Sequence, residues 1–162
     1  MNFLRFLLVL SLALWIGGLV FLPVVAQISF SQLPSPHLAG IVVRGSLLAL
    51  HWVGIVSGLI FLLCSLLEGQ IAGGHLAPFR PSHVIVAVML VLTAISQFHI
   101  IPKMDSLRAA AEEISKLPLD NPIRRQFDFL HATSMRIEEA VLLLGIVLLY
   151  LTTRRLVSSA RP

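Results

Sequence analysis

The chain has 162 residues, of which 57% are hydrophobic and only 12% are charged, against roughly 25% charged residues in a typical soluble domain. A soluble domain of this length has too little interior to bury so much apolar surface. We therefore predict an integral membrane protein embedded in a lipid bilayer. The formal net charge is +4, but the 12 Lys and Arg residues lie mostly beside apolar runs, as membrane anchors do. This argues against a nucleic-acid partner. The single cysteine, Cys64, excludes an internal disulfide.

Four apolar segments predict four transmembrane helices, so residues 1–162 are expected to form a single all-α, integral membrane four-helix bundle. The spans are predicted at approximately 5–26, 47–67, 83–101 and 130–152. The first is long enough to cross a hydrocarbon core of about 30 Å. It is also longer than the apolar core of a secretory signal peptide. We therefore expect it to remain as a membrane span.

Proline, serine, asparagine and glycine set the expected helix ends. A cap residue before proline is typical of a helix start, and this pattern occurs at Ser35-Pro36 and at Asn121-Pro122. Pro102 is expected to end the third span, because proline lacks the N–H that a continuing helix needs. The glycines expected to end the helix of the second span are Gly69, Gly73 and Gly74.

Residues 105–117 predict a short amphipathic helix between spans three and four. Apolar residues recur there at helical spacing, and Arg108, Glu112 and Lys116 follow one another at four-residue intervals. Such a helix would lie on the membrane surface. A solvated helical connector is the alternative.

An even number of crossings places both termini on one side of the membrane. Basic residues are divided almost evenly between the two sides. We expect a bacterial-type inner membrane with both termini in the cytoplasm. Gly54 and Gly58 share a helix face with His51, which would allow a neighbouring helix to approach closely. The glycine faces also allow a homodimer.

The fourth span carries the strongest signal for a site. Its uninterrupted apolar part, 141–151, is too short to cross a bilayer alone, so the crossing must include the polar turns before it. Ionisable groups at membrane depth face the protein interior or a wet cavity. His131, Ser134 and Glu138 share one helix face, so we predict that they line a pocket, together with Trp15. The alternative is a solvated extension above the membrane.

Three histidines fall at similar depth in three spans. His51, His99 and His131 could bind haem or copper, because imidazole is a ligand for both. His99 is expected to share its helix face with Ser96. The alternative is that each histidine only hydrogen-bonds a neighbour or lies among lipid headgroups.

The sequence has no CxxCH, HExxH or GxSxG motif and no phosphate-binding glycine loop, so no catalytic chemistry is indicated. Three functions remain open. The first is a polar intramembrane pocket that binds or passes a small ligand or cation. The others are a structural or partner-binding membrane subunit, and a haem- or copper-binding membrane protein.

Three blocks of the sequence carry a family resemblance. They are WIGGLVF at 15–21 with Leu33-Pro34 and Ala39-Gly40 after it, Pro102-Lys103, and FDFLHATS at 127–134. Together these blocks resemble the transmembrane protein 205-like family of four-span membrane proteins.

This resemblance implies a multi-pass membrane domain of unknown function, with no established reaction. The family pattern places asparagine seven residues after the histidine of the last block, whereas this chain has Glu138 there. The four-helix shape with inward histidines is also similar to copper-resistance membrane proteins and to haem-binding protoporphyrinogen oxidases. That likeness concerns architecture alone.

Overall fold

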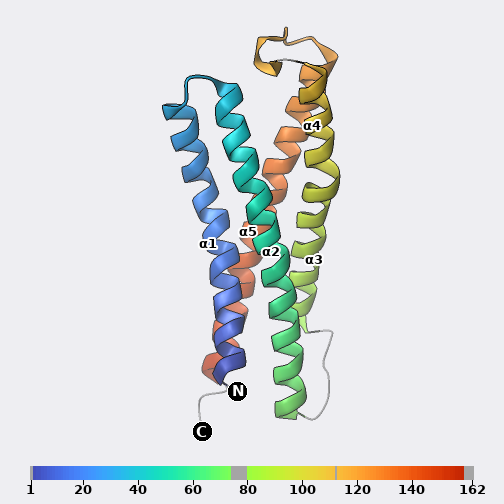
Figure 1. The fold of residues 1–162 in the computed structure, drawn as a ribbon. Coiled ribbons are helices and arrows are strands. Elements are labelled where there is room, and N and C mark those ends of the chain that lie inside the picture. The colour runs from blue at the N-terminus through green and yellow to red at the C-terminus, as the bar shows by residue number, and fades with distance from the viewer. Residues whose placement is uncertain (1, 74–79, 112, 159–162) are drawn as a thin grey trace.

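The computed structural model describes residues 2–73, 80–111 and 113–158, and all the regular structure within these ranges is helical. Four antiparallel columns form the molecule, and both termini lie at the same end (Figure 1). Three columns are the single helices α1 (Asn2–Gln32), α2 (Pro36–Gly73) and α5 (Pro122–Ser158). The other column joins α3 (Pro81–Ile95), the π-helix η1 (Ser96–Ile100) and α4 (Ile101–Ala110), and a 3₁₀ turn, η2 (Ile114–Lys116), follows it.

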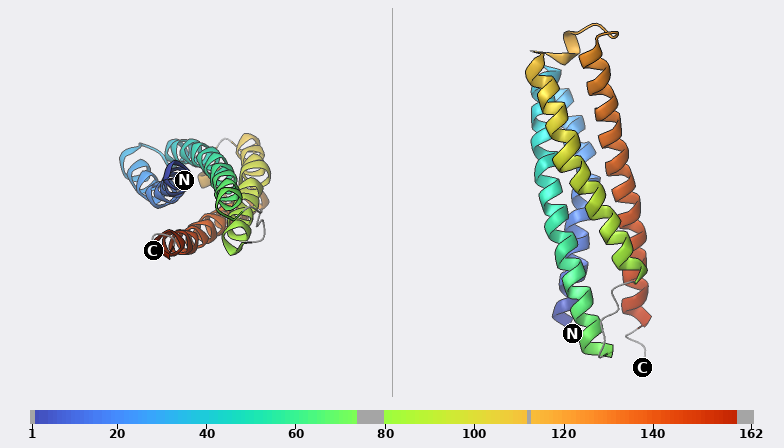
Figure 2. Two further views of the ribbon diagram at one scale, coloured as in Figure 1. Left: turned by 90° about the horizontal axis from the view of Figure 1, so that it is seen from below. Right: turned by 90° about the vertical axis from the view of Figure 1, so that its right-hand side faces the viewer.

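The columns pack as a closed four-helix arrangement, which agrees with the all-α, four-helix part of the predicted fold class. Contacts join α1 to α2, α2 to α3, α3 to α5, and α5 back to α1, as the end-on view in Figure 2 shows. Three columns are long and apolar enough to cross a membrane, namely Asn2–Gln32, Pro36–Ile71 and Pro81–Ala110. The fourth column, α5, is not among the candidate spans found over the described residues, and charged side chains lie on both sides of its apolar part, 141–151.

The two predicted helix starts are confirmed. Ser35 Oγ accepts a hydrogen bond from the Leu38 N–H at 3.3 Å, and Asn121 Oδ1 accepts one from the Ile123 N–H at 2.9 Å. Each contact satisfies a donor that the first helical turn leaves unpaired.

Of the glycines predicted to end the second helix, Gly73 is the last residue of α2, whereas Gly69 lies inside the helix. A glycine inside a helix costs only about 1 kcal/mol, which the packing of a long helix readily offsets. The guanidinium of Arg80 lies over Gly69, where an added Cβ would be 3.5 Å from Nη2. Gly74 lies outside the described residues.

Pro102 does not end the third span. The helix widens into η1 just before it, and the Ile101 N–H bonds to the Ser96 carbonyl, five residues back. A π-turn of this kind accommodates a residue that cannot make the regular bond four residues back. The wider turn also changes which residues share a face. Ser96 and Gln97 are both buried while His99 is exposed, so the predicted shared face of Ser96 and His99 is wrong.

The predicted surface helix at 105–117 is also corrected. Its first part belongs to α4, which continues the third column to Ala110. Ala111 has an extended backbone, with φ −138° and ψ 127°, and among the described residues between Ala111 and α5 the helical structure is limited to η2. Since Pro102 fails to break the helix, residues 105–110 extend the span instead of starting a separate element. Glu112 lies outside the described residues.

The core is centred on Trp15 of α1, which is almost fully buried. Its indole lies across α2 at Gly54 and Gly58, where an added Cβ would come within 2.5 Å of Nε1 and 2.9 Å of Cζ3 respectively. In the reverse direction, Leu50 of α2 packs over Gly18 of α1, where an added Cβ would come within 2.5 Å of Leu50 Cδ1. The glycine face of α2 was expected to allow a close neighbour. Trp15 of α1 packs closely against it at both Gly54 and Gly58.

Candidate functional site

A cavity of about 820 Å³ lies at the end of the bundle away from the termini. At this end α1 and α2 diverge from α4 and the first half of α5 (Figure 1). We call this cavity the cleft, and its walls come from α1, α2, α4, the η2 region and α5.

The two sides of the cleft differ in chemistry. The α1 side is almost entirely apolar, and it consists of Leu19, Leu22, Pro23, Ala26, Gln27 and Phe30. The α5 side is largely polar, and it includes Arg124, Asp128, His131, Ser134, Glu138 and Glu139. A molecule in the cleft would therefore meet an apolar wall on one side and ionisable groups on the other.

Glu138 connects the cleft to the interior of the bundle. Its Oε1 lies 2.8 Å from Nε2 of His51 on α2, and the side chain of Glu138 is 15% exposed against 1% for His51. The other ring nitrogen of His51, Nδ1, lies 2.8 Å from Oε1 of Gln97 in the π-turn. One chain of hydrogen bonds thus joins α2, the third column and α5.

Both ring nitrogens of His51 have a partner. Nδ1 contacts the side-chain amide of Gln97, and Nε2 contacts the carboxyl group of Glu138. The buried ring therefore offers no free lone pair to a metal.

The other residues predicted for the pocket lie at different places. Ser134 lines the cleft and its Oγ is 3.4 Å from Oγ of the buried Ser96. His131 lines the cleft and stacks on Phe127, with ring centroids 6.2 Å apart. Trp15 packs in the core against the glycines of α2 and is not among the residues that line the cleft.

The three histidines considered for haem or copper do not gather at one point. His51 is buried, whereas His99 and His131 are exposed. Within residues 2–73, 80–111 and 113–158, no group of three His, Cys, Asp or Glu side chains could hold a metal ion.

Charged side chains cross the cleft end from α2 to α5. The guanidinium of Arg44 binds both oxygens of Asp105, with Nε 2.6 Å from Oδ1. Arg108 Nη1 lies 3.5 Å from the same carboxylate, and its guanidinium lies over the Phe127 ring at 5.0 Å. These contacts hold α2, α4 and α5 together at this end, since bidentate ion pairs and cation–π contacts are directional.

Outside the helical columns, the cleft wall carries one perturbed carboxyl group. Hydrogen bonds from Lys116 and Ser115 lower the pKa of Glu113, and Lys116 Nζ is 2.6 Å from Glu113 Oε2. Glu113 therefore contributes a negative charge to the cleft at neutral pH.

Gln97 and Asp105 are among the residues of these contacts that were not predicted from the sequence. Gln97 lies among apolar residues in the third span. A lone amide in such a run could have indicated a side chain that faces the interior of the bundle. Asp105 was assigned to a separate surface helix. Its contact with Arg44 could not be predicted, because it depends on the third column continuing as a helix past Pro102.

Residues 10–113 match a family described as a domain of unknown function, DUF4149. The chain belongs to this family. The DUF4149 match covers α1 from residue 10 onward, α2 and the third column, so His51 and Gln97 lie inside it and Glu138 lies beyond it. It provides no evidence for the transmembrane protein 205-like family in particular. Neither a curated protein nor a solved structure matches the chain.

Proposed function

We propose that this DUF4149 chain is a multi-pass membrane protein that crosses the bilayer four times and binds a small ligand or cation in the cleft. Three columns have the length and hydropathy for crossing. On the proposed arrangement, both termini lie on the cytoplasmic side of a bacterial-type inner membrane.

The position of α5 supports a fourth crossing. It runs beside α3 and α1 along the bundle (Figure 2), so a membrane that surrounds those helices also surrounds α5. Its apolar residues Leu143, Ile146 and Val147 are exposed, as lipid-facing side chains are. Arg136 is exposed near the cleft end, where its long side chain can extend to the headgroups.

Cysteine labelling tests this crossing. In a Cys64→Ala background, Leu143→Cys on α5 and Leu63→Cys on α2 should both be protected from a membrane-impermeant maleimide in sealed vesicles, because both side chains would face lipid. Leu119→Cys in the connecting segment should be labelled when the reagent is on its side of the membrane. Rapid labelling of Leu143→Cys while Leu63→Cys stays protected would show that α5 lies outside the bilayer.

The carboxylate of Glu138 is the observation that carries the ligand-binding proposal. Its Oε1 is engaged by His51, while Oε2 has no hydrogen bond to any residue of 2–73, 80–111 or 113–158. Since Glu138 lines the cleft, this oxygen is available to a cation or to a hydrogen-bond donor of a ligand. The opposite apolar wall favours a ligand that also has an apolar part.

The test uses ethidium, a fluorescent lipophilic cation, with the full chain purified in an uncharged detergent. We expect saturable binding measured by fluorescence anisotropy. Glu138→Gln should weaken it about tenfold, because a contact to a charged group contributes about 1.5–3 kcal/mol. The fold should survive this change, since the glutamine carbonyl can still accept from His51.

A matched pair of glycine variants separates the cleft from non-specific binding. Gly40 lines the cleft, and an added Cβ there meets only Arg108 Nη2, at 3.8 Å, so Gly40→Trp should occupy part of the cleft and weaken binding. Gly17 has nothing within 4 Å of an added Cβ, so Gly17→Trp should leave binding unchanged. Equal binding by both tryptophan variants would contradict the proposal.

A further inference from the structure

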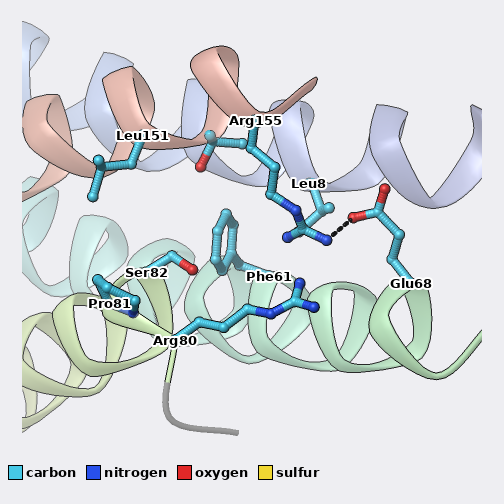
Figure 3. A pocket seen from close by; sticks show the side chains of 9 residues that line it. Leu8, Phe61, Glu68, Arg80, Pro81, Ser82, Leu151 and Arg155 are labelled. Carbon is cyan, nitrogen blue, oxygen red and sulfur yellow. Dashed lines mark hydrogen bonds and ion pairs between the residues drawn. The ribbon is translucent and has the colours of Figure 1, made fainter. Parts of the chain in front are cut away.

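A second, smaller cavity lies at the opposite end of the bundle, near the termini. Its volume is about 190 Å³, and its walls come from α1, α2, the start of α3 and the end of α5. Figure 3 shows its charged side chains together with the apolar Leu8, Phe61 and Leu151. We call it the terminal cavity.

One buried carboxylate and three guanidiniums meet at this cavity. Glu68 is almost fully buried, and its two oxygens are both occupied, Oε1 by Arg5 Nε at 2.8 Å and Oε2 by Arg155 Nη2 at 2.7 Å. The third guanidinium belongs to Arg80, which lines the cavity beside Arg155. The cluster therefore carries an excess of positive charge that Glu68 does not neutralise.

Arg80 differs from Arg5 and Arg155 in its contacts. Its guanidinium has no hydrogen bond or ion pair with any residue in 2–73, 80–111 or 113–158, although it extends toward the same space as Arg155 (Figure 3). The pKa of Arg155 is lowered. Burial is the main cause and the like charges of Arg80 and Arg5 add to it, while the negative charge of Glu68 acts in the opposite direction. An anion placed between Arg80 and Arg155 would relieve this repulsion.

The start of α3 adds a backbone N–H donor to the same place. Arg80 is its N-cap residue but makes no side-chain cap bond, and Pro81 occupies the first turn. The N–H of Ser82 is too close to the helix start to have a partner inside the helix, and Ser82 also lines the cavity. The positive end of the helix dipole therefore points toward the two arginines.

We propose that the terminal cavity binds a phosphate group between Arg80 and Arg155. Guanidinium groups bind phosphate oxygens in a bidentate manner, and the apolar wall of Leu8, Phe61 and Leu151 limits water and so strengthens the attraction. The phosphate can belong to a phospholipid headgroup or to a free phosphate ion. This site lies at the other end of the bundle from the cleft and does not depend on ligand binding there.

The test measures thermal unfolding of the full chain in micelles of an uncharged detergent. One pair of samples contains phosphatidylglycerol or, at equal mole fraction, diacylglycerol, which lacks the phosphate. A second pair contains sodium phosphate or sodium chloride at equal ionic strength. We expect a saturable rise in Tm with a phosphate-containing additive. A rise with phosphatidylglycerol alone identifies a lipid, and a rise with inorganic phosphate identifies the free ion.

Arg80→Gln should raise the half-saturating concentration about tenfold, because it removes a contact to a charged group, and it leaves both Glu68 ion pairs in place. Arg80→Lys, which keeps the charge, should recover most of the affinity. Arg154→Gln is the matched control, because Arg154 is exposed in the same turn of α5 and does not line the cavity. No rise in Tm with either phosphate source, or equal weakening by Arg80→Gln and Arg154→Gln, would overturn the proposal.

Discussion

The two halves of the bundle are built from the same four columns but are packed differently. In the half near the termini, α1 buries Leu8, Leu12, Trp15 and Leu19 at helical spacing, whereas beyond Leu19 it buries only Ser29. The cleft occupies the space that the outer half of α1 leaves open. A single helix thus serves as a core element at one end and as an apolar cavity wall at the other.

The charged groups show the same contrast. Each half has one carboxylate shared by two arginines, Glu68 by Arg5 and Arg155, and Asp105 by Arg44 and Arg108. The Glu68 side chain is 3% exposed and that of Asp105 is 32% exposed. Similar ion-pair composition therefore does not imply similar energetics, because water screens the exposed group far more than the buried one.

Substitutions in the apolar packing should give the largest difference between the two halves in the free energy of unfolding. Trp15→Ala removes the side chain that fills the space over Gly54 and Gly58, and we expect a loss of about 4 kcal/mol in the free energy of unfolding. Phe30→Ala, in the cleft wall, should change it by less than about 0.5 kcal/mol, because Phe30 is 56% exposed. Equilibrium unfolding by sodium dodecyl sulfate in mixed micelles measures both. Comparable losses would mean that the outer half of α1 is packed as firmly as the inner half.

The sequence predicted the four-helix arrangement because its signals are local and strong. Long apolar runs define the columns, and Ser35 and Asn121 cap their helices as expected. The glycine face of α2 also predicted a close neighbour, although it could not specify Trp15. These features depend on composition and helical spacing, which are visible along a single chain.

The errors arose where tertiary packing overrides a local rule. Gly69 lies inside α2, and Pro102 lies inside a continuous helix because the π-turn at Ser96–Ile100 accommodates it. That turn also rotates His99 outward and brings Gln97 to His51. The common depth of three histidines could be estimated from helix lengths, but the direction of each side chain depends on a one-residue change in helical register.

Substitutions in the two ion-pair clusters should show a smaller difference between the two halves in the free energy of unfolding. Glu68→Gln leaves Arg5 and Arg155 without their negative partner, so we expect a loss of about 3 kcal/mol in the free energy of unfolding. Asp105→Asn should cost about 1 kcal/mol or less, because the pair is partly solvated, and this cost should shrink as salt is raised from 0.05 to roughly 0.5 M. Unfolding in mixed micelles of an uncharged and a denaturing detergent at the two salt concentrations measures both variants. The Glu68→Gln loss should depend less on salt, because the Glu68 carboxylate itself is only 3% exposed. If salt reduced both losses equally, the burial of Glu68 would not set its energetic role, and the contrast between the two ends would rest on packing alone.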